Sequence, residues 1–247
     1  MKITVYTTIT GGFDHLMPHA DTPGARFVCL TDRPSDPSLQ GRGWEVCEIP
    51  HTDEGWTPRA VAKWSKMHPH RLFRSADLTV FVDGNKQIVS DLTPLIEDLG
   101  SHPYGLFTHP AQANTVKSEA VKLIRRLRCE DWGPRRIKKQ VRHYEQCCPQ
   151  VLGSSVFAGY VHFRRMGCDL LNETMEDWWS QVVAFQMRDQ IALAYVLMVS
   201  GLRPYVWPKN VFGRYFVRYR HGTDDVEQYR GMRCEVPEEL QSPWGDT

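Results

Sequence analysis

Residues 78–85, Leu-Thr-Val-Phe-Val-Asp-Gly-Asn, decide the fold of this 247-residue chain. The uninterrupted apolar and β-branched run over 78–82 is typical of a strand buried on both faces, as in a parallel sheet. The run ends at the polar triplet Asp83-Gly84-Asn85. Such a triplet also forms turns, and on its own a strand-ending turn is the plainer interpretation. The buried strand before it places Asp83 at the mouth of the sheet, which favours a functional role.

The segments before this strand alternate between strand and helix patterns. Short β-branched or alternating runs predict strands over 2–8, 26–30 and 44–49. Residues 59–73 have helical spacing, and Pro69 inside them is expected to kink or divide the helix. This order predicts a single α/β domain with a mostly parallel central sheet flanked by helices.

Open sheets of this kind bind ligands beyond the carboxyl ends of their strands. The residues predicted to end the strands are therefore expected to meet at one edge and to form the candidate site: Tyr6, Thr7, Thr8, Asp32, Asp83 and Gly84.

The second half of the chain is more helical. Helices are predicted over 118–128 and 134–144, and long helices over 168–200. Residues 151–164 are predicted to form one or two strands, and the aromatic segment 207–219 is strand-like. We expect one domain over 1–222, followed by an acidic tail over 223–247.

Composition excludes several classes of protein. The 30 basic and 29 acidic residues give a net charge of +1, so no overall field favours a polyanion. No apolar run approaches the length of a membrane span or a secretory signal. The seven cysteines show no Cys-x-x-Cys spacing, which predicts reduced thiols and a cytoplasmic protein.

The triplet at 83–85 has the chemistry of a cation site. A carboxylate and a second oxygen ligand two residues apart suit Mg²⁺ or Mn²⁺, and Gly84 allows a ligand to approach the backbone closely. Upstream, Arg59, Lys63 and Lys66 are spaced by four and three, so they share a helical face that could contact a diphosphate. Solvated surface lysines are the alternative interpretation.

These motifs together resemble a known family. The chain is similar to the glycosyltransferase-like family of plant turgor-regulation-defect and mucilage-related proteins, from residue 3 to about 196. The resemblance is carried by Tyr6-Thr7, Gly12, Cys29-Leu30-Thr31-Asp32, Trp44-Glu45-Val46, Arg59, Lys66, Pro69-His70, Phe81 to Asn85, His109-Pro110, Glu119, Trp178-Trp179 and Arg188-Asp189-Gln190.

The resemblance implies a GT-A fold, a nucleotide-sugar donor and a divalent cation. Asp83-Gly84-Asn85 occupies the place of the metal-binding Asp-x-Asp motif, so Asp83 and Asn85 are the implied ligands. Asn85 is neutral, and the site would hold its metal with one charge fewer. A late histidine often completes such sites. His221 is the best-placed match, and His109 is its rival.

Residues 188–190 form the second anchor. Arg188, Asp189 and Gln190 open an apolar helix, where an acid is favourable and a capping role is the alternative interpretation. The Asp-Gln pair is similar to the pair near the anomeric carbon in retaining GT-A enzymes. We therefore expect a hexosyl- or pentosyltransferase that retains configuration, with a uridine diphosphate sugar as donor. Inversion would instead require a carboxylate base such as Asp189 or Glu119.

The local charge of the sequence indicates which classes of acceptor to expect. Residues 117–143 hold ten basic and three acidic residues, a charge of +7, whereas residues 224–247 carry −5. The expected acceptor contacts are His109, Glu119, Trp132, Arg135, Arg136, Lys138 and Lys139. A basic helical pair with an aromatic residue can bind phosphates, although an ordinary solvated face is the alternative. A glycan or unspecified acceptor comes first, a hydroxylated base of viral DNA second, and an inactive GT-A-like binding module third.

Overall fold

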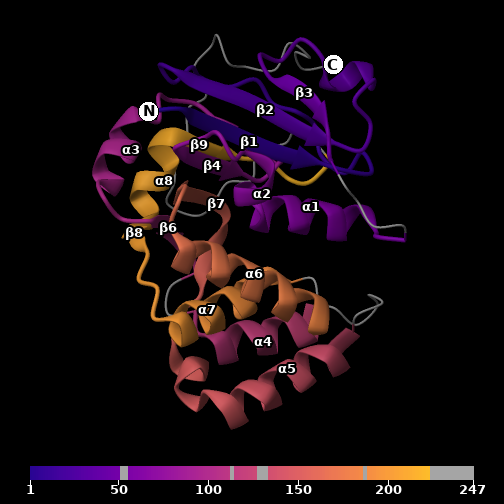
Figure 1. The fold of residues 1–247 in the computed structure, drawn as a ribbon. Coiled ribbons are helices and arrows are strands. Elements are labelled where there is room, and N and C mark those ends of the chain that lie inside the picture. Colours follow the sequence, from indigo (N-terminus) through magenta and orange to yellow (C-terminus); the bar gives the residue numbers. More distant parts are fainter. Residues whose placement is uncertain (51–54, 112–113, 127–132, 186–187, 223–247) are drawn as a thin grey trace.

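Strand β4 (Leu78–Val82) lies at the centre of a seven-stranded sheet, and all five of its residues are buried as predicted (Figure 1). The computed structural model describes residues 1–50, 55–111, 114–126, 133–185 and 188–222. The strand order is β3-β2-β1-β4-β7-β6-β8. Its apolar residues contact core clusters on both faces of the sheet, Val80 and Val82 on one and Phe81 on the other.

The sheet is mostly parallel, as expected. Strands β1 (Ile3–Ile9), β2 (Ala25–Thr31), β3 (Glu45–Glu48) and β4 run in the same direction. Strand β7 (Phe157–Arg165) is antiparallel to both β4 and β6 (Tyr104–Thr108), and β6 is parallel to β8 (Tyr205–Trp207). The chain leaves β1 toward β2 on one side and returns to β4 on the other. This reversal of strand order is where open α/β sheets bind ligands.

Helices cover both faces of the sheet. Helix α1 (Pro58–Met67) begins at an N-cap, Thr57, and α2 (Pro69–Leu72) follows it, so Pro69 divides the predicted helix. Helices α6 (Asp169–Ala184) and α7 (Asp189–Ser200) pack with α1 in one apolar cluster. On the other face, α3 (Thr93–Leu99) and α8 (Lys209–Tyr215) pack against β4 and β7.

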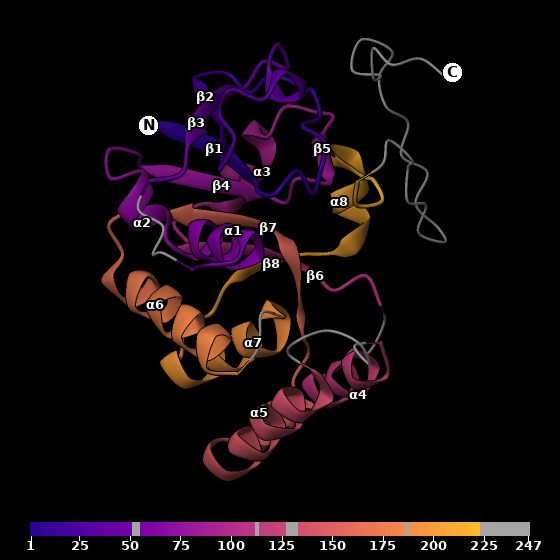
Figure 2. The same cartoon turned by 90° about the vertical axis from the view of Figure 1, so that its right-hand side faces the viewer.

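A second helical layer lies outside α7. Helices α4 (Val116–Arg126) and α5 (Gly133–Cys147) pack together with the 3-10 turn η2 (Pro149–Gly153) and α7. Figures 1 and 2 show this layer at the end of the molecule farthest from β2 and β3. The second half of the chain is therefore helical, as the sequence indicated.

Two predicted strand segments differ in the structure. In the segment 207–219, α8 separates the end of β8 from β9 (Phe216–Arg218). The aromatic residues suggested a strand, but Phe212 lies in α8, where its ring packs on Phe107 of β6 and on Phe216, four residues further along. In the segment 151–164, η2 comes first and β7 starts only at Phe157. A short strand, β5 (Lys86–Ile88), pairs with β9 in a separate two-stranded sheet.

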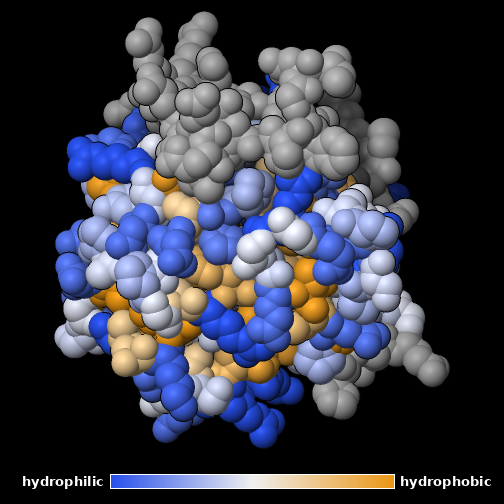
Figure 3. Space-filling view, turned by 90° about the horizontal axis from the view of Figure 1, so that it is seen from above, coloured by the Kyte–Doolittle hydropathy of each residue, from blue (hydrophilic) through white to orange (hydrophobic). Residues whose placement is uncertain are grey.

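The surface mixes polar and apolar residues. Figure 3 looks down on the molecule from above the view of Figure 1 and shows apolar residues near the centre of this face, with polar side chains around and between them.

A short 3-10 turn, η1 (Pro37–Leu39), lies in the β2–β3 connection. Among the described residues, no helix combines the length and the hydropathy needed to cross a membrane. The predicted tail over 223–247 lies outside the described residues.

Candidate active site

Asp83 follows β4 at the reversal of strand order, where the sequence placed it. Its backbone N–H donates to the carbonyl of Tyr160 on β7 at 2.8 Å, which fixes the end of the strand. The side chain is 30% exposed, whereas the strand before it is buried. Asp83 is therefore a carboxylate on a rigid support with access to solvent.

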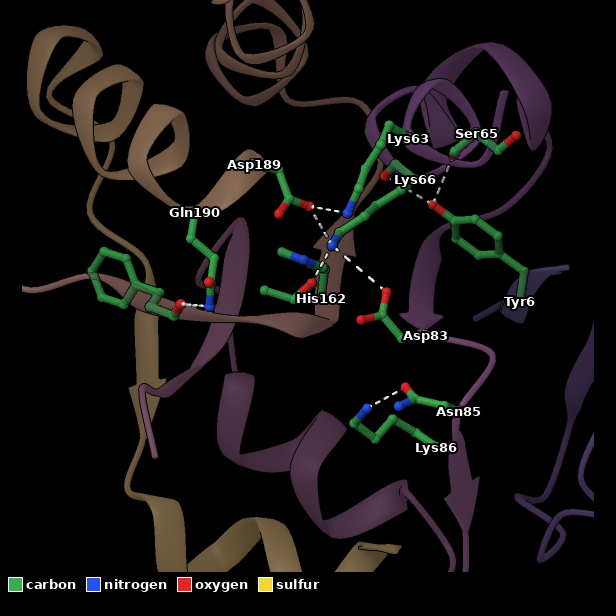
Figure 4. Close-up of polar contacts among 12 residues, drawn as sticks. Tyr6, Lys63, Ser65, Lys66, Asp83, Asn85, Lys86, His162, Asp189 and Gln190 are labelled. Atoms are coloured by element: carbon green, nitrogen blue, oxygen red, sulfur yellow. Dashed lines mark hydrogen bonds and ion pairs between the residues drawn. The ribbon is translucent and has the colours of Figure 1, made fainter. Parts of the chain in front are cut away.

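A buried cluster of charged residues faces Asp83. Both Lys63 and Lys66, one turn apart on α1, place their ammonium groups 2.7 Å from the same Oδ2 atom of Asp189. The ammonium of Lys66 also lies 3.7 Å from Asp83 Oδ1. Figure 4 shows Lys66 between the two carboxylates. The structure thus brings four predicted site residues together, from α1, α7 and the end of β4.

This charge arrangement fixes the protonation of Asp189. Burial alone would raise the pKa of its carboxyl group, but the ammonium groups of Lys63 and Lys66 hold that pKa well below its usual range. Burial would likewise lower the pKa of Lys66, yet the carboxylates of Asp189 and Asp83 raise it. Burial, together with the neighbouring ammonium of Lys66, lowers the pKa of Lys63. Asp189 is therefore an anion at neutral pH and a poor proton acceptor.

The contacts of Asp189 replace its capping interpretation. Arg188 is the N-cap residue of α7 and makes no side-chain capping bond, while the carboxylate of Asp189 contacts lysines of another helix. The Asp189 backbone carbonyl accepts a hydrogen bond from the indole of Trp178 at 2.8 Å. Helix α7 is thereby held against α6 with its first acid directed at α1.

Close packing against β7 completes the cluster. Gly159 on β7 accepts a hydrogen bond from Lys66 through its carbonyl oxygen. A Cβ atom at this glycine would lie 3.2 Å from Gln190 Cγ and 3.7 Å from Lys66 Nζ. Gln190 donates from Nε2 to the carbonyl of Phe157 at 3.2 Å. Figure 4 shows this amide beside the cluster, on the α7 side.

His162 on β7 lies next to the cluster and is fully buried. Burial, together with the nearby cations Arg164 and Lys66, lowers the pKa of this imidazole well below its ordinary value. The hydroxyl of Tyr104 lies 2.6 Å from its Nδ1 atom. His162 is therefore neutral and adds no charge to the cluster.

Asn85 lies beyond Asp83 in a fixed orientation. Its side-chain Nδ2 donates to the backbone carbonyl of Tyr219 at 2.8 Å, and its backbone carbonyl accepts from the Tyr219 N–H at 2.9 Å. Because an amide nitrogen must face the Tyr219 carbonyl, the amide oxygen faces the other way. There it accepts a hydrogen bond from the ammonium of Lys86, as Figure 4 shows.

His221, the late histidine expected to bind the metal, lies beside Asn85. Its Nδ1–H donates to Asp14 Oδ1 at 2.8 Å, which leaves Nε2 as an acceptor 3.4 Å from Asn85 Nδ2. The carboxylate of Asp14 also lies across Gly84, where a Cβ atom would come within 3.1 Å of its Oδ2. A side chain at position 84 would therefore require Asp14 to shift by a few tenths of an ångström.

These side chains, as they lie, do not fit a divalent cation. The oxygen of Asn85 holds an ammonium group, and the free edge of His221 faces an amide nitrogen. Within the described ranges, no three His, Cys, Asp or Glu side chains gather in a way that could hold a metal ion. Of the three residues expected to bind the metal, Asp83 alone presents an oxygen toward solvent.

The residues expected from β1 lie inside the strand and not beyond it. β1 continues to Ile9, so Tyr6, Thr7 and Thr8 are buried. The Tyr6 hydroxyl lies 3.3 Å from the Ser65 carbonyl and 3.2 Å from that of Lys66, and burial raises the pKa of Tyr6 to about 12. This correction removes Tyr6 from the donor contacts and makes it a support for the end of α1.

The remaining donor residues are less central. Asp32 is exposed beyond β2 and accepts from the N–H of Gly11 at 2.9 Å, so it holds the β1 loop. Arg59 and Arg188 are half-buried at the starts of α1 and α7. Lys63 and Lys66 were expected to contact a diphosphate, but in the structure their ammonium groups bind Asp189.

The predicted acceptor residues fall into two groups. Glu119 is buried and accepts from Asn114 Nδ2 at 2.7 Å, and the same amide nitrogen lies 3.3 Å from His109 Nδ1. These residues form one polar cluster between β6 and α4. The second group comprises four exposed basic residues of α5: Arg135, Arg136, Lys138 and Lys139. Trp132 lies outside the described residues.

Sequence reasoning missed Lys86 and Asp14. Lys86 directly follows the polar triplet, and a charged residue in a predicted turn gave no sign that it is buried. Asp14 lies in a loop, and its contact with His221 spans 207 residues. The contact between Asp14 and His221 follows no local spacing rule, and the nearest signal in the sequence is the Gly11-Gly12 turn. For Lys86, the signal in the sequence is its place next to Asn85.

The mostly parallel sheet flanked by helices is a GT-A-like α/β architecture. In sequence, residues 44–214 match the family described as TOD1/MUCI70, glycosyltransferase-like domain. The match covers more than half of the chain, which therefore belongs to this family. None of the curated proteins matches the chain.

Solved structures share the architecture at low sequence identity. Mouse xyloside xylosyltransferase 1, in its apo form, is 10% identical with a TM-score of 0.50, covering 84% of this chain and 85% of that chain. The bifunctional glycosyltransferase WbbM, also apo, is 14% identical with a TM-score of 0.47, and 85% of this chain covers 39% of that one. Both neighbours are glycosyltransferases, and the likeness to the mouse enzyme supports the fold.

Proposed function

We propose that the protein transfers a sugar from a nucleotide-sugar donor to an acceptor hydroxyl, with retention of configuration. The observation that supports this best is the juxtaposition of Asp83 with the Asp189 cluster through Lys66, 2.7 Å from one carboxylate and 3.7 Å from the other. Residues from three separate elements meet at the reversal of strand order, where a donor binds in folds of this type.

Retention is supported by the charge state of Asp189. An inverting transferase needs a base that takes the acceptor proton, and a base works best with a pKa near the working pH. Asp189 has a strongly depressed pKa and both of its neighbours are ammonium groups. In a retaining reaction the acceptor attacks from the side of the leaving group, so this carboxylate does not need to take the acceptor proton.

The donor base, the sugar and the cation remain predictions from the sequence. Uridine diphosphate is the expected leaving group, carrying a hexose or a pentose. The expected Mn²⁺ or Mg²⁺ would supply positive charge to the departing diphosphate, but the side chains of Asn85 and His221, as they lie, do not fit such an ion. The contacts among Asp83, Lys63, Lys66 and Asp189 do not involve that ion.

A donor screen tests the proposal. The protein is incubated with nucleotide sugars of all common bases, once with Mn²⁺ and once with EDTA, and the release of nucleoside diphosphate is measured. We expect release from at least one donor, and the anomeric configuration of the product reports retention. Asp83→Asn should lower the rate about 100-fold or more, because the positive charge that develops on the sugar loses a carboxylate of the site.

The matched control is Asp36→Asn, which neutralises a carboxylate in the β2–β3 connection, and it should retain full activity. Absence of release from every donor under both conditions would contradict the transferase. That result would favour the inactive binding module.

A second acceptor class is supported by one observation. The basic residues on α5 are exposed, as a phosphate-binding face requires. We therefore keep a glycan or unspecified acceptor first and a hydroxylated base of duplex DNA second. DNA binding would depend on the charge of the whole basic face of α5, so its test neutralises several residues of this face together.

A further inference from the structure

Lys86 is a buried cation at the end of the central strand. The residue is 5% exposed, and its ammonium donates to the amide oxygen of Asn85. The same ammonium lies 5.2 Å from the centre of the Tyr160 ring, on β7. Figure 4 shows Lys86 and Asn85 directly below Asp83.

The surrounding backbone holds Lys86 in this position. It is the first residue of β5, which pairs with β9, and its N–H donates to the carbonyl of Asp83 at 2.9 Å. Tyr219 follows β9, binds both the backbone and the side chain of Asn85, and donates from its hydroxyl to Gln87 at 2.6 Å. The oxygen of Asn85 is thereby kept toward Lys86.

Lys86 supplies positive charge beside Asn85. In an Asp-x-Asp motif, both acidic side chains can bind a divalent ion. Here Asn85 is neutral, and its amide oxygen accepts from the ammonium of Lys86. An ammonium group carries three N–H donors on a flexible stem, and lysine is a common ligand of phosphate.

We propose that the Lys86 ammonium binds the donor diphosphate in place of a divalent cation, so that donor binding is metal-independent. This inference rests on the proposed transferase function. In the reaction, the bond from the anomeric carbon to the diphosphate oxygen breaks, and its electron pair leaves with the nucleoside diphosphate. The acceptor oxygen bonds to the anomeric carbon, and its proton passes to the departing oxygen. Lys86 stabilises the negative charge that develops on this leaving group.

The first test measures nucleoside diphosphate binding to the full chain by calorimetry in EDTA, with uridine, guanosine, adenosine and cytidine diphosphates as probes. We expect the wild type to bind one of them, and added Mn²⁺ to change its affinity by less than about threefold. Lys86→Met should weaken binding roughly tenfold or more, the scale of a lost hydrogen bond to a charged group. Lys86→Arg keeps the charge and should stay within about threefold.

Lys209→Met is the matched control, because it makes the same change at an exposed position of α8. Thermal unfolding of each variant verifies that it is folded, and the wild-type comparison of EDTA with Mn²⁺ needs no variant. The double variant Asn85→Asp/Lys86→Met restores two carboxylates and removes the ammonium. We expect it to bind the diphosphate with Mn²⁺ and to lose about tenfold in EDTA.

Two results overturn the role of Lys86 while leaving the transferase intact. One is wild-type binding that disappears in EDTA and returns with Mn²⁺. The other is binding by Lys86→Met equal to that of the wild type. A protein that binds no nucleoside diphosphate under either condition, and releases none from any donor, instead overturns the proposed function along with this inference.

Discussion

At the scale of single residues, Asp189 is a buried carboxylate held by two ammonium groups. Removing one partner of a buried ion pair leaves the other charge without compensation, which costs several kcal/mol. Because Lys66 is 2% exposed in its side chain and Lys63 21%, the loss falls mainly on Lys66. These contacts of Asp189 therefore stabilise the packing of α7 on α1.

Asp189→Asn should lower the free energy of unfolding by about 3 kcal/mol at pH 7, measured in urea. A carboxyl group with a depressed folded pKa stabilises the protein above its unfolded pKa of about 4 and loses this effect as the pH falls through the folded value. The difference between wild type and variant should therefore be full above about pH 5 and shrink in stronger acid. The exposed control Lys139→Met should change stability by under about 0.5 kcal/mol, and an Asp189→Asn loss that small would contradict the buried-pair argument.

At the scale of elements, the pairing of β6 with β7 and β8 depends on a glycine. A Cβ atom at Gly105 would lie 2.6 Å from Trp207 Cζ3 and 2.8 Å from Leu99 Cδ1. Trp207 on β8 and Leu99 on α3 are both buried, so neither can move away freely. Strand β6 can therefore approach β8 and α3 this closely only without a side chain at position 105.

Gly105→Ala should destabilise the protein by about 1–3 kcal/mol through overpacking, measured by urea unfolding. Gly153→Ala is the matched control, because no atom lies within 4 Å of its added Cβ and its backbone conformation suits any residue. The control should be neutral or slightly stabilising. Equal stability of the two variants would show that the β6–β8 contact is looser than described.

Elements with a dense local signal were predictable. The apolar run of β4 and the proline that divides α1 from α2 are written in consecutive residues. Helix α8 was missed because aromatic residues fill a segment whose helical packing depends on distant partners such as Phe107. In the site, residue types at Asp83, Lys63, Lys66 and Asp189 were anticipated. Their pairing was not, because it joins residues up to 126 positions apart.

At the scale of the whole molecule, a balanced charge conceals an uneven distribution. The total is +1, yet residues 117–143 alone carry +7. The structure places the basic residues of α5 on the exposed side of the outer helical layer, whose inner side packs on α7 through Ile137 and Tyr144. Separation of the apolar and basic faces is what any solvated helix requires, so this distribution alone does not distinguish a DNA-binding face from an ordinary one.

Neutralising the basic face of α5 distinguishes a DNA-binding face from an ordinary solvated one. The four substitutions Arg135→Gln, Arg136→Gln, Lys138→Gln and Lys139→Gln remove four positive charges from one surface. If duplex DNA is the acceptor, electrophoretic binding at low salt should weaken at least about tenfold, and its salt dependence should flatten because fewer phosphate contacts release counterions. The control removes the same charge from exposed residues elsewhere: Arg74, Arg203, Lys209 and Arg214. Equal binding by both variants would assign any DNA affinity to net charge, and no binding by the wild type would leave the glycan acceptor alone.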